Sequence, residues 1–167
     1  VDFIVVTNAD CHLQPLFTRN PGKITNQQVL MAMMALKGIY APYGVQALNH
    51  GLGYPTAAIE LLLPTYGAQL GLKGKVATRW VLNPHPTLIP AIEAGFVEHV
   101  YAFGGEPGME EYVQARPDIF AVGPDGSMRS NRCCAHIAGL YAIDLFIGAT
   151  LQIDRFGNSS TAIRGMI

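Results

Sequence analysis

The chain has 167 residues, 50% of them hydrophobic and 14% charged, with a net charge of −1 at pH 7. This length allows one compact domain over residues 1–167 and leaves too little chain for two full ones. The near-neutral charge gives no electrostatic footprint for DNA or RNA, and no segment combines about 20 apolar residues with the scarcity of charges that a membrane span needs.

Apolar runs of strand length alternate with helix-length segments along the whole chain. We expect strands at residues 2–7, 44–49, 76–82, 97–103, 117–122, 143–147 and 150–153. We expect helices at residues 27–36, 57–63, 87–94 and 131–141, and a short one ending at residue 112. Thr25 or Asn26 should cap the first helix and Gly38 should end it. The alternation favours an α/β fold with an open, mostly parallel sheet and flanking helices.

The composition also predicts a partner surface and a longer polypeptide. The charged fraction is low for a soluble domain, where about a quarter is usual, so we expect an oligomeric or multidomain interface. The chain begins at once in an apolar run and stops at residues 164–167 without a polar tail, as expected of an internal fragment. The three cysteines include the adjacent pair Cys133 and Cys134, which fits a reducing cytoplasm better than a disulfide framework. No cysteine–histidine group has zinc spacing, so we expect no metal site.

Residues 51–57 (GLGYPTA) form the most informative motif, since they join a predicted strand to a predicted helix. Glycine lets the backbone approach a ligand and adopt positive φ, and a helix start offers N–H donors with partial positive charge. Gly51 and Gly53 therefore predict an anion or carbonyl site, although a plain strand–helix turn explains their spacing equally well. The dinucleotide fingerprint lacks its third glycine, so a nicotinamide site is not expected.

Further candidates lie on neighbouring loops, because ligands bind beyond the carboxyl ends of parallel strands. His85 stands between two prolines at a strand end, where it is either a binding group or a structural histidine. Glu106 follows a glycine pair at another strand end, where its carboxylate could act as a nucleophile or base, or could favour a helix start. Asn158 and Ser159 could hydrogen-bond a carboxylate or thioester oxygen, or could simply form a turn.

The glycine motif resembles the G-x-G-x-P-T segment of CoA-transferases and of the citrate lyase α chain. Over essentially its whole length the chain is similar to the malonate decarboxylase α-subunit family. The segments that agree with that family are residues 1–23, 49–55, 82–87, 144–154 and 157–162. The resemblance implies a CoA-transferase-like domain, and the family's much longer chains hold two such domains.

The resemblance also implies an acyl exchange. Acetyl on the phosphopantetheine-type (dephospho-CoA-derived) arm of an acyl carrier protein would be replaced by malonyl from malonate, and partner decarboxylase subunits would regenerate the acetyl carrier. Acyl transfer develops negative charge on a carbonyl oxygen, which backbone N–H groups stabilise. We expect the amides around Gly53 and Tyr54 to hold that oxygen, and Gly51, Asn83 and His85 to line the pocket.

One departure from the CoA-transferases concerns the nucleophile. Their covalent mechanism uses a glutamate at the end of the strand after the glycine turn, whereas the corresponding strand here runs into Asn83-Pro-His-Pro86. Another part of the polypeptide could supply the nucleophile, Glu106 could replace it, or malonate could attack the acetyl thioester directly to give a mixed anhydride. We favour direct attack. The competing functions are a non-catalytic carrier-docking domain, a CoA-thioester hydrolase and another CoA-transferase.

Overall fold

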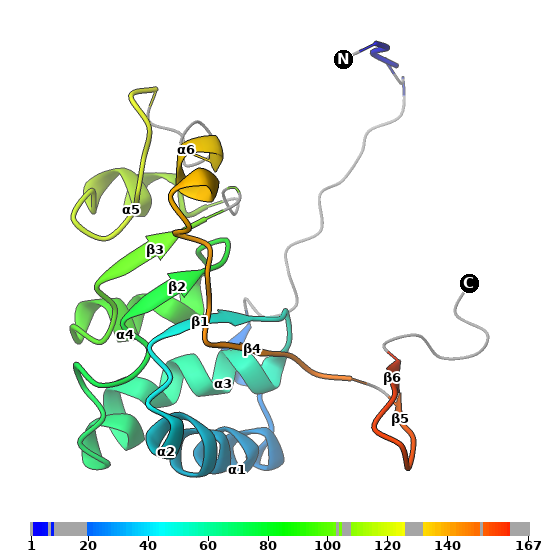
Figure 1. Ribbon diagram of the computed structural model, residues 1–167, viewed down its shortest axis with the longest axis vertical. Helices are drawn as coiled ribbons and strands as arrows, with labels where there is room; N and C mark the ends of the chain where they lie inside the picture. The colour runs from blue at the N-terminus through cyan, green and yellow to red at the C-terminus, as the bar shows by residue number, and fades with distance from the viewer. Residues whose placement is uncertain are drawn as a thin grey trace.

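The computed structural model describes residues 2–6, 8, 20–102, 104, 108–125, 132–150 and 152–160. Four parallel strands form one sheet in the order β3-β2-β1-β4 (Figure 1). These strands are β1 (Ala47–His50), β2 (Arg79–Val81), β3 (His99–Tyr101) and β4 (Leu145–Ile147). Two short antiparallel strands, β5 (Gln152–Ile153) and β6 (Ser159–Ser160), form a hairpin after β4. The predicted α/β class with a mostly parallel sheet and flanking helices is confirmed.

The helices connect and flank these strands. They are α1 (Asn26–Ala35), α2 (Ala41–Tyr43), α3 (Tyr54–Leu62), α4 (Ile89–Glu93), α5 (Glu110–Ala115) and α6 (Arg132–Ile137). The 3-10 turns are η2 (Pro21–Lys23) and η5 (Pro86–Leu88), and the π-helical segments are η3 (Leu36–Tyr40) and η4 (Leu63–Gly67). Figure 1 shows α1, α2 and α3 toward one end of the molecule and α5 and α6 toward the other. Within the described residues, no helix has the length and apolar character needed to cross a lipid bilayer.

The first helix begins where the sequence predicts and ends later. The Thr25 hydroxyl accepts from the Gln28 backbone N–H at 3.3 Å, and the Gln28 side chain accepts from the Thr25 N–H at 2.9 Å, which makes a capping box. Gly38 does not end the helix, because η3 and α2 continue it to Gly44, whose φ of 58° is left-handed. Leu36 and Tyr40 on this continuation are fully buried, and that burial stabilises it past the glycine.

The core lies between the central strands and the helices. Leu48 of β1 and Trp80 of β2 are fully buried, and α3 contributes Ala58 and Ile59 to the same cluster. Helix α1 packs along α3. The Trp80 indole N–H donates to the Ala77 carbonyl at 2.6 Å, so this large buried side chain leaves no polar atom unpaired. Since α3 starts at the glycine motif, this packing fixes the motif relative to the sheet.

Two predicted strands are wrong. Residues 2–6 form no strand, and their apolar side chains are exposed, with Phe3 at 88%. An apolar run forms a strand only against a partner edge, and none of the described strands pairs with this run. Residues 117–122 provide only one bridge, between Val100 and Phe120. The remaining predicted strands are present but shorter than expected.

Candidate functional site

The carboxyl edge of the sheet brings together loops that are distant in sequence. Strand β1 ends at His50 and runs into Gly51, β2 runs into the loop that holds Asn83 and His85, and β4 runs into Gly148. All these strands are parallel, so their carboxyl ends meet at one edge. The structure therefore brings the loops after β1 and β2 to one edge of the sheet, as the sequence predicts.

Gly51 is a glycine because the backbone of another strand passes close to it. Its N–H donates to the Ile147 carbonyl at 2.8 Å, and a Cβ added to it would lie 3.1 Å from Gly148 Cα and 3.3 Å from Phe146 Cζ. Neither Gly51 nor Gly53 uses the left-handed conformation that glycine permits, and Gly53 is extended with φ 164°. The backbone that lies close to Gly51 is that of Gly148, directly after β4, and not that of a ligand.

The start of α3 is held by a threonine hydroxyl. Gly53 precedes the helix as its N-cap residue, and Tyr54 is the first helical residue. The Thr56 Oγ1 lies 2.7 Å from the Gly51 carbonyl oxygen and 2.8 Å from that of Gly53, so its single hydrogen is shared between them. The first turn of a helix carries N–H groups that have no acceptor inside the helix, and Pro55 removes one of those donors. The turn is thus rigid and presents the positive end of the helix.

A cavity of about 490 Å³ lies beside this turn. It is lined by Gly51, Leu52, Phe146, Gly148, Ala149, Thr150 and Ser159. Two of the predicted site residues, Gly51 and Ser159, therefore share one cavity. Its walls combine apolar side chains with the backbone of the glycine turn, which is the composition of many small-molecule sites.

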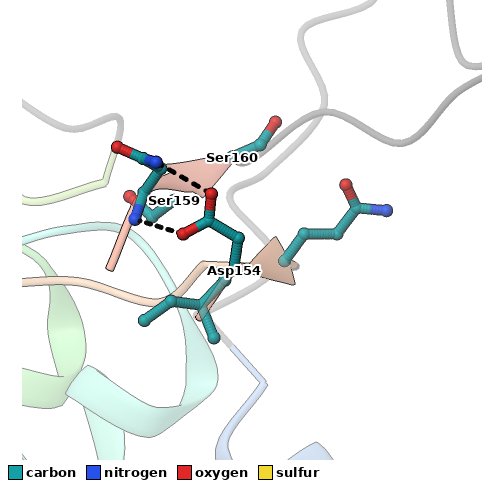
Figure 2. Close-up of a pocket in the computed structure, with 6 residues that line it drawn as sticks. Asp154, Ser159 and Ser160 are labelled. Atoms are coloured by element: carbon teal, nitrogen blue, oxygen red, sulfur yellow. Dashed lines mark hydrogen bonds between the residues drawn. The ribbon is translucent and has the colours of Figure 1, made fainter. Parts of the chain in front are cut away.

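A second, more open hollow of about 710 Å³ lies on the β5–β6 hairpin (Figure 2). Its side chains are Gln152, Ile153, Asp154, Asn158, Ser159 and Ser160. The Asp154 carboxylate accepts from the Asn158 side-chain amide at 2.8 Å and from the Asn158 backbone N–H at 2.9 Å, as the dashed lines in Figure 2 show. These bonds, led by the one from the Asn158 side chain, lower the pKa of Asp154. The Asn158 amide nitrogen thus braces the hairpin turn.

A buried polar network lies under the glycine turn, and its centre is Glu60 of α3. The Glu60 carboxylate is fully buried and lies 2.9 Å from His50 Nδ1 and 2.9 Å from His85 Nε2. The Thr87 hydroxyl donates to it at 2.5 Å. On the far side of His50, Nε2 lies 2.6 Å from the Tyr40 hydroxyl. The network joins α3 to the carboxyl ends of β1 and β2.

The charge on Glu60 follows from these neighbours. Burial by itself raises the pKa of a carboxyl group, but His85 and His50 outweigh it and lower the pKa of Glu60 from 4.5 to about 2. Burial, and then the nearby Glu60 charge, raise the pKa of Tyr40 far above its usual value. Glu60 is therefore a carboxylate and Tyr40 a neutral hydroxyl at neutral pH.

The other predicted site residues take separate places. Asn83 is exposed, and its backbone carbonyl lies 2.9 Å from His85 Nδ1. His85 is buried in the network, and neither of the two cavities described here includes it in its lining. Glu106 lies outside the described residues. Among the residues that are described, no group of three or more His, Cys, Asp and Glu side chains could hold a metal ion.

Sequence reasoning missed the residues at the centre of this network, which are Tyr40, His50, Glu60 and Thr87. A usable signal was present for one of them. Glu60 is the one charged residue in the predicted helix 57–63, and a carboxylate on an otherwise apolar helix is usually either paired or functional.

Comparison with known proteins gives a consistent result. A family model described as malonate decarboxylase, alpha subunit, transporter matches residues 1–167. An acetyl-S-ACP:malonate ACP transferase from Malonomonas rubra is 65% identical over 162 residues, which cover 97% of this chain and 29% of that protein.

Two solved structures also resemble the chain. They are a Pseudomonas malonate decarboxylase hetero-tetramer in complex with malonate and a malonate decarboxylase alpha subunit from Acinetobacter baumannii. Each has a TM-score of 0.85 and 61% sequence identity, and each match covers 99% of this chain and 30% of the solved chain. The chain thus spans less than a third of the length of these relatives.

Proposed function

The chain belongs to the malonate decarboxylase α-subunit family, and from this we propose that it forms part of an acyl-carrier-protein transferase. The resemblance seen in the sequence is thereby confirmed at the level of the family. The proposed reaction exchanges acetyl for malonyl on a carrier-protein thioester. The observation that carries this proposal is the 65% identity to the Malonomonas rubra transferase. The glycine turn beside an apolar cavity supports it.

The cavity beside Gly51 is the site where we propose that the thioester carbonyl binds. Leu52 and Phe146 would exclude water, and the amides of Gly53 and Tyr54 at the start of α3 would face the oxygen on which negative charge develops. Preorganised N–H donors of this kind are worth about 3–4 kcal/mol in acyl transfer. Asn83 and Asn158, together with Ser159 in the cavity wall, remain our candidates for contacts to the substrate.

Direct attack by malonate gives a balanced reaction. A malonate carboxylate oxygen would attack the carbonyl carbon of the acetyl thioester, and the C–S bond would break. The carrier thiolate would depart as the leaving group, and acetyl and malonyl would be joined in a mixed anhydride. The thiolate would then attack the malonyl carbon of that anhydride, breaking the C–O bond and releasing acetate. No proton is gained or lost overall. This route needs no glutamate after β2, where the sequence has Asn83. A glutamyl-enzyme route through Glu106 is the alternative.

The wider setting is also a proposal. The acyl group would be attached as a thioester to the phosphopantetheine-type (dephospho-CoA-derived) arm of an acyl carrier protein, with no other cofactor bound. Partner decarboxylase subunits would consume the malonyl carrier in a cytoplasmic oligomer, in keeping with the Pseudomonas hetero-tetramer. We also propose that residues 1–167 are one CoA-transferase-like domain of a longer two-domain polypeptide, since the match covers 29% of the Malonomonas rubra protein.

An exchange assay tests this function. The full chain is mixed with acetyl carrier protein and labelled malonate, and label should appear on the carrier as acetate is released. Carrier binding without any transfer of label would instead support a docking domain. Hydrolysis, or a preference for free CoA thioesters over carrier thioesters, would support a hydrolase or another CoA-transferase.

A pair of variants then tests the nucleophile. If Glu106 is a catalytic carboxylate, Glu106→Gln should slow exchange by at least about ten-fold, whereas direct attack by malonate predicts near-normal turnover. Glu98→Gln, at an exposed position before β3, is the matched control. A glutamyl thioester trapped on Glu106 would refute direct attack.

A further inference from the structure

The network under the glycine turn contains more hydrogen-bond acceptors than two neutral histidines can serve. His85 Nε2 lies 2.9 Å from Glu60 Oε2, and His85 Nδ1 lies 2.9 Å from the Asn83 carbonyl oxygen. A carbonyl oxygen and a carboxylate both accept and cannot donate. A neutral imidazole has one N–H and can serve only one of them, whereas an imidazolium has two and serves both.

His50 differs because one of its neighbours is a donor. Its Nδ1 faces the Glu60 carboxylate at 2.9 Å, and its Nε2 faces the Tyr40 hydroxyl at 2.6 Å. The hydroxyl can donate to Nε2, so a neutral His50 protonated on Nδ1 satisfies both contacts. His85 therefore needs a proton on both ring nitrogens, whereas His50 needs a proton only on Nδ1.

We propose that His85 is held as an imidazolium between the Glu60 carboxylate and the Asn83 carbonyl, and that this charged clamp positions the loop after β2 against α3. Glu60 is then a positioning residue: it acts through His85 on the loop that holds Asn83, and through α3 on the turn at Gly51–Gly53. The structural part of this proposal is independent of the reaction. Its consequence for exchange rests on the proposed function.

The surroundings favour the charged form of His85. The titratable groups that contact the network within the described chain are Tyr40 from η3, His50 from β1 and Glu60 from α3, and Glu60 is the one carboxylate among them. Trp80 packs its ring edge-to-face on His50 with 4.6 Å between ring centroids, but its N–H is engaged by Ala77. The Glu60 carboxylate thus lies against His85 and favours the positive charge on that ring.

The loss of one proton has a specific effect. If His85 becomes neutral, it must release either Glu60 or the Asn83 carbonyl, and its 7% exposure gives water little access to replace the lost bond. Release of Glu60 would remove the His85 contact between the loop after β2 and α3, and release of the Asn83 carbonyl would loosen the loop around Asn83. Exchange should fall at alkaline pH as His85 loses its second proton, while the fold remains.

Counting the protons on the ring tests the clamp directly. Neutron diffraction from the deuterium-exchanged full chain at pH 7 should show deuterium on both nitrogens of His85 and only on Nδ1 of His50. Deuterium on a single His85 nitrogen would overturn the proposal. This measurement needs no variant and no activity, so it stands whether or not the chain exchanges acyl groups.

Glu60→Gln tests the positioning role through the pH profile of exchange. Without the carboxylate, His85 should lose its second proton at lower pH, so the alkaline limb of the profile should move to lower pH by at least one unit. Glu93→Gln, which changes an exposed carboxylate on α4, should leave the profile in place. A rate that falls equally at every pH would mean that Glu60 supports only the fold, and would overturn the positioning role. No exchange by the unmodified protein would refute the proposed function alone.

Discussion

Replacing Glu60 by Gln should destabilise the fold far more than an ordinary carboxylate-to-amide change. Glu60 is fully buried and accepts hydrogen bonds from His50, His85 and Thr87. Glutamine offers one acceptor oxygen in place of two, and its NH₂ group would point its own hydrogens at groups that already donate. Buried donors would be left unpaired, and His85 would lose its counter-charge.

The expected loss of stability can be bounded in two ways. Breaking a buried ion pair by removing one partner costs about 3–5 kcal/mol, and release of a proton by His85 would relieve part of this, leaving about 2–4 kcal/mol. Independently, the lowering of the Glu60 pKa from 4.5 to about 2 corresponds to about 3 kcal/mol of preference for the charged form. Both figures describe the same buried ion pair.

The sign of the pH dependence follows from the same shift. Because the pKa of Glu60 is lower in the folded protein than in the unfolded chain, its stabilisation is present above about pH 4.5 and is lost as the pH falls toward 2. The difference in stability between the unmodified protein and Glu60→Gln should therefore shrink as the pH falls below 4.5. If His85 is the imidazolium proposed above, the difference should also shrink at alkaline pH, as the folded His85 loses its second proton.

Urea unfolding of the full chain measures this difference, and amide hydrogen exchange in peptides from α3 locates it. Glu93→Gln is the matched control: its carboxylate is exposed and pairs with Arg116 at the surface, so the loss should stay within about 1 kcal/mol. The reasoning is refuted if Glu60→Gln destabilises no more than this control, since Glu60 would then not be an ionised, fully paired group.

Four other variants test the glycine turn and the sheet edge. Gly51→Ala should lose about 1–3 kcal/mol in urea unfolding, because its Cβ would meet backbone at 3.1 Å. Gly53→Ala, where the nearest atom is 3.5 Å away, should lose less than the Gly51 variant, and equal losses would contradict the packing argument. Thr56→Val removes the hydroxyl shared by two turn carbonyls and should cost about 1 kcal/mol; an unchanged midpoint would count against that role. Asp144→Ala removes the hydrogen bonds from the backbone N–H groups of Gln46 and Ala47 at the start of β1 and should cost about 1–3 kcal/mol, with faster amide exchange in β1.

The elements that local signals specify were predictable. The cap at Thr25 and the apolar run at residues 57–63 that predicted α3 are features of consecutive residues, and the structure has both the cap and the helix. The convergence of the loops after β1 and β2 was also predictable, because it follows from parallel strand pairing alone.

The features that depend on distant partners were not predictable. Gly51 is explained by Gly148, 97 residues later, and its spacing with Gly53 gave no indication of that neighbour. His85 was expected to line the pocket, yet it is buried against Glu60, and Glu60 in sequence is only a charge on an apolar helix. A single sequence does not show which residues of different strands and helices lie opposite one another, so contacts between their side chains cannot be inferred from it. The run at residues 2–6 shows the same limit, since apolar character does not supply a pairing edge.

The position of β4 has a consequence for how the molecule forms. Asp144, just before β4, accepts a hydrogen bond from the Ala47 amide at 2.8 Å across 97 residues of chain, whereas the pairings of β1 with β2 and of β2 with β3 join consecutive strands. Closing so long a loop is entropically slow, so we expect β1, β2, β3 and their helices to assemble first and β4 to dock last. Because Phe146 and Gly148 form one wall of the cavity at Gly51, the cavity comes into being only at that final step. In a newly made chain, the buried pair of Glu60 and His85 would therefore form before the cavity that we propose for the substrate.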